Sequence, residues 1–537
     1  MLSTEPTVGA AEPYLPRPPG RREKYEYFGK PRRLVFAWLL VAAVGILYGY
    51  VRVAEHAWLV APIMWLLLMV MVPPVVINFW LRAGRPRLTL AEHQSTVASY
   101  TDDCETIDVF LPSCGEPLAI LNNTYSYVAQ LKWDGGAKTV YVLDDSARQQ
   151  VRDLADTYGF RYVVRPNPGE MKKAGNLTHA LTVSDGDFIV VIDADFAVRP
   201  DFLQETMPYF ADPKVGIVQT AQCFDVTNPS LSYIQRYAGT LQEIFFRFIQ
   251  PARDRYKAAI CAGTNLVYRR AAVEAAGGFA QVPIGEDVHS GVKLWWAGYE
   301  TRYLQLCLCK GVAPADFASL ANQQARWCRS SMLLMIDPHF QKAPFTWQQR
   351  AAFWAAFLYY MSSAALVITG PFPTIAMIWF FPAKVYPHNY LPIIPAMAAG
   401  LFAFPFLSRG WRPTIYRLCV LNSCCHLYAV WFAIRGVVAE WIPTGASPWS
   451  GVVPVAVGRM LRTWIVLVLA LIWSGLALRV REFGWHQYWA TELLAGVQVY
   501  MLVPLLTPSK GVWKRTPATV QPPGAAWETA ERGPQAA

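Results

Sequence analysis

The chain has little charge for its length. Only 16% of its 537 residues are Asp, Glu, Lys or Arg, against roughly 25% in an ordinary soluble domain. Hydrophobic residues make up 54%, which excludes intrinsic disorder and a collagen-like chain and argues against a purely soluble protein. A chain of this size is also no small disulfide scaffold. The length allows about three or four domains, and the composition favours a membrane protein.

Metal-binding and redox spacings are also lacking. The eight histidines form no HExxH motif, and the closest cysteine pairs, Cys307 with Cys309 and Cys424 with Cys425, are not CxxC pairs. We interpret the cysteines as reduced, buried, small apolar residues. No sequence repeat is present. Zinc modules, thiol redox motifs and solenoids are therefore excluded.

Two long apolar runs stand near the N-terminus, at residues 34–53 and 57–81. Each suffices for a bilayer core of about 30 Å, which takes roughly 20 helical residues. Basic residues flank the outer ends of the pair, so the positive-inside rule predicts that both ends are cytoplasmic. They are Arg17, Arg21, Arg22, Lys24, Lys30, Arg32 and Arg33 before the runs, and Arg82, Arg85 and Arg87 after them. A cleaved signal peptide is disfavoured, because the polar lead is long and a second span follows at once.

No run between about residues 102 and 317 is apolar enough to span a membrane, which predicts a cytoplasmic soluble domain there. Two segments beyond it are apolar on one face only, and we expect interface helices at 346–358 and 411–438. Four further spans, at 359–381, 390–407, 452–478 and 485–506, bring the expected total to six. The predicted division is a basic cytoplasmic tail (1–33), a transmembrane hairpin (34–81), the soluble domain (102–330), interface helices (331–358), spans (359–407), an interface helix with a loop (411–446), spans (450–506) and a disordered tail (507–537).

Within the soluble domain, short β-branched runs alternate with helical patterns. Strands are expected at 106–111, 139–143, 161–164 and 188–192, and helices at 117–131, 147–158 and 172–184. This alternation predicts an α/β fold with a parallel sheet covered on both faces. Ligands bind such sheets beyond the carboxyl ends of the strands, so the residues that follow each strand are the informative ones.

Asp193-Ala-Asp195 follows an apolar strand directly. The strand period of two places both carboxylates on one side of the chain, which suits Mg²⁺ or Mn²⁺ bridging to a substrate diphosphate. The alternative is a solvated strand end. Asp185-Gly-Asp187 has the same spacing, but we expect a loop there.

Three more clusters carry chemistry. Lys172-Lys173-Ala-Gly-Asn176 opens a helix, where backbone N–H groups and lysines form a phosphate cradle or merely a basic surface. Asp287, after Glu286, is a candidate general base. In Gln323-Gln324-Ala-Arg326-Trp327, the arginine is suited to leaving-group phosphate and the tryptophan to a sugar ring. Taken alone, this last cluster is more typical of an interfacial helix end.

Taken in chain order, these clusters resemble the processive family-2 glycosyltransferases, the group of cellulose, chitin and hyaluronan synthases. Asp144-Asp145, Asp193-Ala-Asp195, Glu286-Asp287 and Gln323-x-x-Arg326-Trp327 match the family's D, DxD, ED and QxxRW set. Local strings look specifically like bacterial cellulose synthase catalytic subunits: Val109-Phe-Leu-Pro-Ser, Lys173-Ala-Gly-Asn-Leu177, Val218-Gln-Thr220, Cys261-Ala-Gly-Thr-Asn265 and Gly277-Gly-Phe279. The resemblance covers about residues 34–506.

The resemblance implies a cytoplasmic GT-A (Rossmann-like) domain between two N-terminal and about four C-terminal membrane helices. It assigns the donor UDP-sugar to Ser113, Glu116, Asp144, Asp145, Lys173, Asp193 and Arg326, with Asp193 and Asp195 holding Mg²⁺ or Mn²⁺. It assigns the base to Asp287 and the acceptor glycan to Glu286, Gln323 and Trp327. Asp193, Asp195 and Asp287 form the expected catalytic set.

The implied function is processive, inverting synthesis of a β-1,4-glucan from UDP-glucose at the inner membrane, with the growing glycan extruded through the spans. A sister polymerase making β-1,3-glucan, chitin-like polymer or hyaluronan stays open, as do accessory subunits or a homo-oligomer. A non-catalytic transporter or scaffold is the distant alternative, and the intact acidic set argues against it. No nucleic-acid partner is expected, because the basic residues flank spans.

Three departures from the family pattern stand out. The mobile gating loop corresponds to Trp441-Ile-Pro-Thr444-Gly-Ala446, which has Trp in place of Phe and lacks the lysine. Gly285 stands where the family often has threonine. Residues 507–537 are too few for a cyclic-di-GMP-binding barrel, so regulation by that nucleotide is not expected.

Overall fold

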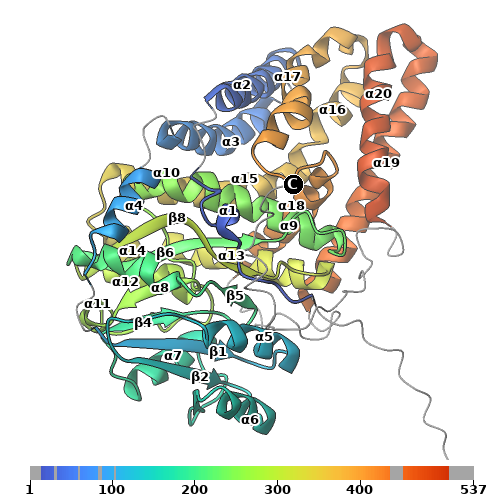
Figure 1. Ribbon diagram of the computed structural model, residues 1–537. Helices are drawn as coiled ribbons and strands as arrows, with labels where there is room; N and C mark the ends of the chain where they lie inside the picture. Colours follow the sequence, from blue (N-terminus) through green and yellow to red (C-terminus); the bar gives the residue numbers. More distant parts are fainter. Residues whose placement is uncertain are drawn as a thin grey trace, which may run out of the picture.

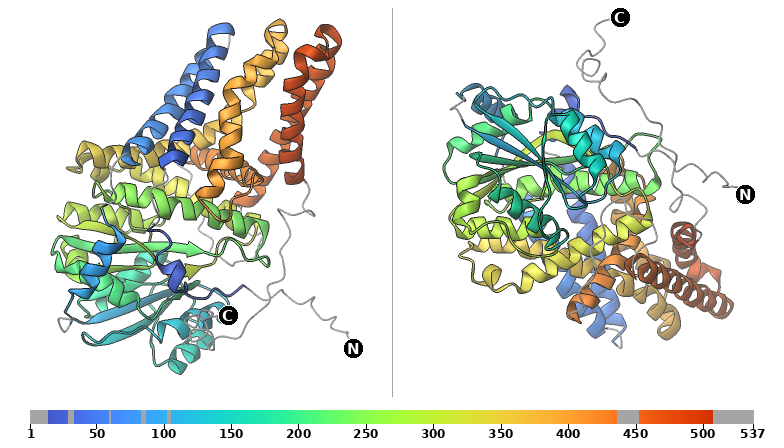
Figure 2. Two further views of the ribbon diagram at one scale, coloured as in Figure 1. Left: turned by 45° about the horizontal axis from the view of Figure 1, so that its top comes forward. Right: turned by 90° about the horizontal axis from the view of Figure 1, so that it is seen from below.

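The computed structural model describes residues 14–28, 33–58, 61–82, 87–101, 105–435 and 452–506. It consists of an α/β domain with a group of long helices standing on one side of it (Figure 1). Turned toward the viewer, the helices rise as separate columns above the domain (Figure 2). The expected fold class, an α/β domain set between N-terminal and C-terminal apolar helices, is confirmed.

Eight strands form one sheet in the order β3-β2-β1-β4-β7-β6-β8-β5. They are β1 (Ile107–Ser113), β2 (Lys138–Asp144), β3 (Arg161–Val163), β4 (Phe188–Val191), β5 (Phe196–Val198), β6 (Val215–Phe224), β7 (Leu266–Arg269) and β8 (Glu300–Gly311). The four strands expected from the sequence are β1 to β4, and each pairs in parallel with its neighbour among them.

The expectation of a parallel sheet throughout is wrong. β7 runs antiparallel to both β4 and β6, and β5 runs antiparallel to β8, so the sheet is mixed. Some of the later strands contain buried polar residues, so they do not stand out in the sequence as apolar runs. Gln219 in β6, for example, is fully buried and donates from Nε2 to the carbonyl oxygens of Thr220 and Thr264, at 2.9 Å each. Burial of this polar side chain costs little free energy because its hydrogen bonds are satisfied.

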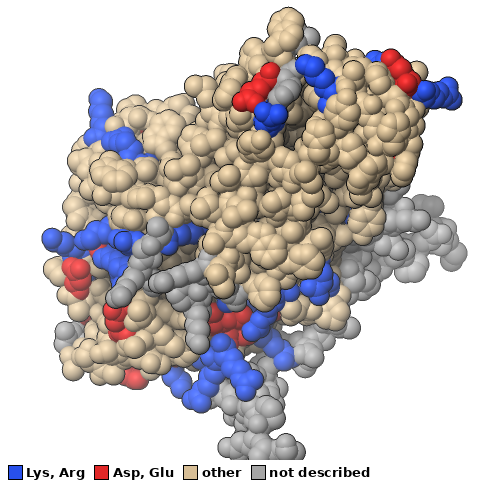
Figure 3. All heavy atoms as spheres, turned by 90° about the horizontal axis from the view of Figure 1, so that it is seen from above, with Lys and Arg blue, Asp and Glu red and all other residues tan. Residues whose placement is uncertain are grey.

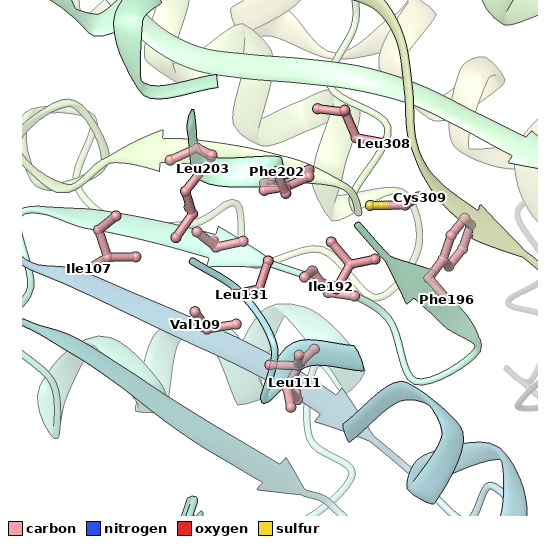
Figure 4. Close-up of a cluster of buried hydrophobic side chains, with 14 of the residues drawn as sticks. Ile107, Val109, Leu111, Leu131, Ile192, Phe196, Phe202, Leu203, Leu308 and Cys309 are labelled. Carbon is pink, nitrogen blue, oxygen red and sulfur yellow. The ribbon is translucent and has the colours of Figure 1, made fainter. Parts of the chain in front are cut away.

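Alternation along β1 divides the core between two faces of the sheet. Ile107, Val109 and Leu111 face one cluster (Figure 4), which buries residues of α5 (Leu118–Val128) and α6 (Gln149–Thr157). Phe110 faces the other, which buries residues of α7 (Lys172–Thr182), α11 (Arg270–Ala275) and α12 (Glu286–Trp296). Both faces are therefore covered, as predicted.

The domain has nine further helical elements in the described chain. They are α1 (Arg21–Lys24), α4 (Leu90–Ala98), α8 (Phe202–Thr206), η1 (Met207–Ala211), α9 (Tyr233–Ile244), η2 (Phe245–Ile249), α10 (Gln250–Asp254), α13 (Phe317–Ile336) and α14 (Pro338–Lys342). The apolar helices are α2 (Arg33–His56), α3 (Ala61–Arg82), α15 (Trp347–Thr369), α16 (Phe372–Phe380), α18 (Ile415–Ile434), α19 (Val452–Phe483) and α20 (Trp485–Leu502).

Five helical stretches of the described chain are long and apolar enough to cross a membrane: Leu34–Glu55, Ala61–Arg82, Trp347–Phe380, Ile415–Ile434 and Val452–Phe483. Seen from above, most of the molecule's face on this side carries no charge (Figure 3). The first two stretches agree with the expected hairpin. These helices support a membrane protein, as expected.

The later helices differ from the expected spans. The segment 346–358 is no separate interface helix but the start of Trp347–Phe380, and 411–438 holds a stretch apolar enough to span. Over 390–407 there is no continuous helix but η4 (Pro387–Ile393), α17 (Ile394–Ala398), η5 (Ala399–Ala403) and η6 (Phe404–Phe406). Prolines at 392, 395 and 405 break it, because proline lacks an N–H and clashes in a helix interior. α20 is not among the five stretches.

Part of the expected N-terminal tail belongs to the folded domain. Within residues 14–28, Lys24 is buried and forms ion pairs with Glu205 and with Asp201, the latter at 2.6 Å. Glu23 accepts from Lys310 at 2.9 Å. We call residues 14–28 the N-terminal strap. Basic composition alone predicted a tail because the acidic partners lie some 180 positions away in sequence.

One pair of cysteines contradicts the expectation of reduced thiols throughout. Cys223 in β6 and Cys307 in β8 form a disulfide. The two cysteines are 84 residues apart in sequence and become neighbours only because β6 and β8 pair in the sheet. No spacing rule applied to the sequence detects such a pair.

Candidate active site

Asp193 and Asp195 lie in the turn between β4 and β5, beyond the carboxyl end of β4. Two hydroxyl groups hold this turn. The backbone N–H of Asp193 donates to Oγ1 of Thr264 at 2.8 Å, and Oγ1 of Thr124 donates to the carbonyl oxygen of Ala194 at 2.6 Å. The two carboxylates are therefore positioned from both sides by buried threonines of other segments.

The electrostatics of this turn favour a cation. Burial, followed by the charges of Asp193 and Glu116, raises the pKa of Asp195 to about 7. Two carboxylates so close together repel each other unless a positive charge lies between them. A divalent metal ion would supply that charge.

Lys173 already supplies one positive charge from the first turn of α7. Its Nζ forms an ion pair with Oδ1 of Asp193 and donates to the carbonyl oxygen of Gly263 at 2.8 Å. Burial lowers the pKa of Lys173, but Asp193, Glu286 and Asp287 outweigh burial and raise it. The lysine therefore stays charged, as a phosphate-binding residue must.

Asp287 stands in the first turn of α12. Its Oδ1 accepts from the backbone N–H of Val288 at 2.9 Å. Gly263 packs against the carboxylate, and a Cβ at that position would lie 3.0 Å from Oδ2 of Asp287. Burial, followed by the charge of Glu286, raises the pKa of Asp287 to about 7. A carboxylate with a pKa near neutrality is suited to general-base catalysis.

Arg326 comes from the middle of α13. Burial lowers its pKa, and four carboxylates oppose that shift; they are Glu286, Asp287, Asp193 and Asp195. The guanidinium group therefore lies within electrostatic reach of both acidic motifs. On the same helix Trp327 is partly buried, and Oε1 of Gln323 is buried with no hydrogen-bond partner in the part of the chain that the structure describes.

Of the residues expected at the nucleotide end, Asp145 acts mainly within the protein. Asp145 pairs with Arg165, which donates from Nε and Nη2 at 2.5 and 2.6 Å. Arg165 also donates to the carbonyl oxygens of Glu170 and Lys172 and so fixes the loop that leads to Lys173. Asp145 therefore positions the lysine through Arg165.

Ser113 and Asp144 are partners in the β1–β2 register, and the Ser113 hydroxyl lies 3.5 Å from Oδ1 of Asp144. Oε2 of Glu116 accepts from the backbone N–H of Cys114 at 2.6 Å. The structure thus brings together Asp193, Asp195, Lys173, Glu286, Asp287 and Arg326, with Ser113, Glu116, Asp144 and Asp145 beside them at the carboxyl ends of β1 and β2. Trp441 and Thr444 lie outside the described residues.

Sequence reasoning missed Thr124, Gly263 and Thr264 as parts of the site. Gly263 and Thr264 lie in the string Cys261-Ala-Gly-Thr-Asn265, so a signal for them existed. Gly263 has a φ of +79°, a left-handed conformation that favours glycine. For Thr124, in the middle of α5, the sequence offers no signal.

A metal ion at this site would depend on its substrate. The described residues contain no cluster of three or more His, Cys, Asp or Glu side chains suited to a metal. Asp193 and Asp195 offer two carboxylates, and Mg²⁺ or Mn²⁺ bound through one or two carboxylates takes further oxygens from phosphate and water. The residues present therefore fit a metal that binds together with a diphosphate.

Comparison with known proteins agrees with this geometry. The model of the family described as glycosyl transferase family group 2 matches residues 188–403, from β4 through α12 and α13 into the apolar helices. Cellulose synthase 1 of Komagataeibacter xylinus is 29% identical over 319 residues, covering 58% of this chain and 20% of that protein. The UDP-forming cellulose synthase catalytic subunit of Pseudomonas fluorescens (strain SBW25) is 29% identical over 297 residues, covering 55% of this chain and 40% of that protein.

The chain therefore resembles a family 2 glycosyltransferase over residues 188–403, which supports the expected enzyme class. Its curated relatives include cellulose synthase catalytic subunits, of whose length the matched part is less than half. Among solved structures, a mannosyltransferase from Pyrobaculum calidifontis is similar over 69% of this chain and all of its own, with 18% identity and a TM-score of 0.43.

Proposed function

We propose that this protein polymerises a β-linked glycan, a β-1,4-glucan made from UDP-glucose, by processive and inverting transfer. The observation that carries the proposal is the convergence of Asp193, Lys173, Asp287 and Arg326. They come from four separate segments, yet their charges act on one another. The names of the cellulose synthase relatives support the choice of polymer.

On the donor side, Asp193 and Asp195 would hold Mg²⁺ or Mn²⁺ together with the diphosphate of the UDP-sugar. When bound, the metal supplies positive charge that stabilises the leaving diphosphate. Lys173 and Arg326 supply positive charge from the protein itself, in surroundings where burial strengthens it.

On the acceptor side, the Asp287 carboxylate takes the proton of the terminal glycan hydroxyl. The hydroxyl oxygen then bonds to the anomeric carbon while the bond from that carbon to the UDP oxygen breaks. One displacement on the opposite face turns an α-linked donor into a β-linked product. Trp327 offers an aromatic face for the acceptor sugar, and Gln323 offers the unpartnered Oε1 as a hydrogen-bond acceptor.

The position of the acceptor helix supports export of the polymer through the apolar helices. α13 buries Leu320 and Cys328 in one cluster with Leu421 of α18 and with Val457 and Leu461 of α19. An acceptor held along α13 is therefore next to two candidate spans. This packing supports delivery of the chain directly into the bilayer region, and we propose that the catalytic domain lies on the cytoplasmic side of the inner membrane.

A radiolabel assay tests the proposal. Purified full-length protein in detergent or nanodiscs receives UDP-glucose, UDP-N-acetylglucosamine or UDP-glucuronate, each with Mg²⁺ or Mn²⁺. We expect high-molecular-weight product from UDP-glucose, degraded by a β-1,4-glucanase and resistant to a β-1,3-glucanase. Product from another donor, or with β-1,3 linkage, would identify a sister polymerase. Absence of transfer from every donor, with either metal, would refute the proposed function.

A further inference from the structure

The carboxylate of Asp144, which the resemblance assigns to the nucleotide, is engaged by the protein itself. Its Oδ1 accepts from the backbone N–H of Ser146 at 3.0 Å. Its Oδ2 accepts from the backbone N–H of Arg148 at 2.9 Å and from the hydroxyl of Tyr162 at 3.0 Å. With the hydroxyl of Ser113 also lying 3.5 Å from Oδ1, each carboxylate oxygen of Asp144 already has two donors within the protein, which leaves it little capacity to bind a ligand. Asp144 therefore orders the loop after β2, and neighbouring residues must contact the nucleotide.

The side chain of Arg148 is the group this loop leaves unsatisfied. Its Nε and Nη2 are buried, and neither has a hydrogen-bond partner in the part of the chain that the structure describes. The hydroxyl of Tyr125 also has no partner of good hydrogen-bond geometry among the described residues, although the hydroxyl of Ser113 lies near enough to lower the pKa of Tyr125. The ring of Tyr125 is fully buried and packs edge-on against Tyr158 and Phe160, so its hydroxyl is held rigidly in place.

Arg148 and Tyr125 lie in the same surroundings. Burial raises the pKa of Glu116 and of Tyr125, and in both cases the charge of Arg148 works against the rise. The charges of Asp144 and Glu116 also act on Tyr125. Two unsatisfied donors and two carboxylates therefore meet beyond the carboxyl ends of β1 and β2.

The chemistry of these groups defines the ligand they would bind. A guanidinium group only donates hydrogen bonds, so its partner must be an acceptor. The nearby carboxylates repel an anionic acceptor, and the diphosphate has Lys173 and Arg326 elsewhere. A neutral carbonyl oxygen satisfies the donors without that repulsion. Uracil offers two carbonyl oxygens on one ring.

We propose that Arg148, together with the hydroxyl of Tyr125, contacts the base of the donor nucleotide by donating to its carbonyl oxygens and so determines nucleotide specificity. This inference rests on the proposed function, because it assumes a uridine nucleotide as donor. It adds a specificity-determining contact that none of the sequence motifs contains.

Titration calorimetry of the full-length protein with Mn²⁺ tests the inference. Arg148→Gln should weaken binding of UDP about tenfold, a loss of about 1.4 kcal/mol. The affinity for inorganic pyrophosphate should change by less than about twofold. The preference for UDP over GDP should fall about tenfold. Tyr125→Phe, which removes only the hydroxyl, should also lower the affinity for UDP.

The control is Arg152→Gln, one turn further along α6. Its guanidinium lies over the Tyr162 ring, 4.8 Å from the centroid, and its loss should leave UDP affinity unchanged. The thermal midpoint and the UDP affinity of Arg148→Lys are measured together. A lower UDP affinity at an unchanged midpoint shows a lost contact, whereas a lower midpoint shows a folding defect. A fold that stays intact with unchanged UDP affinity would overturn the inference, and so would equal losses for UDP and pyrophosphate.

The two proposals fail separately. Sugar transfer that is absent from every UDP-sugar refutes the proposed function, while the UDP and pyrophosphate titrations still decide the role of Arg148. Sugar transfer from UDP-glucose together with unchanged UDP affinity in Arg148→Gln refutes the inference alone.

Discussion

Gly285 and Ser330 stand in direct contact between the helices that carry the base and the leaving-group arginine. A Cβ at Gly285 would lie 1.7 Å from Oγ of Ser330. Gly285 precedes α12, which carries Asp287, and Ser330 lies one turn beyond Arg326 on α13. The absence of a side chain at 285 therefore sets how closely these two helices approach.

Gly285→Ala should accordingly slow transfer by roughly tenfold or more, because about 1 Å of misplacement at a reacting centre has effects of that order. The φ of +75° at Gly285 adds backbone strain. Initial rates with UDP-glucose provide the measurement. Gly285→Ala combined with Ser330→Gly should recover part of the rate. No recovery would show that backbone strain at residue 285, and not the clash with Ser330, slows transfer.

Asp287→Asn should abolish polymer formation and leave UDP binding within about twofold, because the amide cannot accept the acceptor's proton. Product by radiolabel and affinity by calorimetry are measured on the same preparation. Synthesis at the wild-type rate would disprove the assignment of the base.

The transfer rate should depend on the protonation of Asp287, whose pKa burial and Glu286 raise to about 7. The base acts when deprotonated, so activity should be full above that pKa and fall about tenfold for each pH unit below it. Rates at saturating donor between pH 5.5 and 8.5 give the profile. A flat profile over this range contradicts the prediction, and UDP binding measured at each pH serves as the control.

Asp195→Ala should remove the metal-dependent part of donor binding. One carboxylate of the pair is then lost, and Asp193 alone remains paired with Lys173. We expect UDP affinity that no longer responds to Mn²⁺, measured by calorimetry with and without EDTA. Asp185→Ala, in the outlying Asp-Gly-Asp sequence, is the matched control and should behave as wild type.

Lys24→Ala should destabilise the domain by about 3 kcal/mol, since breaking a buried ion pair leaves Glu205 with His93 alone, while Asp201 keeps Arg199. The side chain is 6% exposed and neutralises Asp201 and Glu205. The thermal midpoint in detergent should fall by several degrees, whereas the exposed neighbour Arg21→Ala should leave it unchanged. Equal thermal midpoints for both variants would show that the ion pairs of Lys24 do not stabilise the domain.

The sequence by itself determined the strands that carry the motifs. Apolar runs such as Phe188-Ile-Val-Val are buried, and buried parallel strands place whatever follows them at one edge of the sheet. Position after a strand or at a helix start predicts Asp193 and Lys173, whereas Arg326 is singled out only by its resemblance to the family motif. The first two apolar stretches were equally clear, because length and apolarity are local properties.

Only the tertiary structure decided which groups these residues meet. Thr124 and Thr264 support the DxD turn from segments about 70 residues away on either side, and Gly263 packs against Asp287 from another element. Asp144 carries a family motif, yet its carboxylate is engaged by the protein's own loop while Arg148 remains unsatisfied. A sequence fixes which residue types follow each strand. Hydrogen-bond partners depend on how distant segments pack, which one-dimensional patterns do not contain.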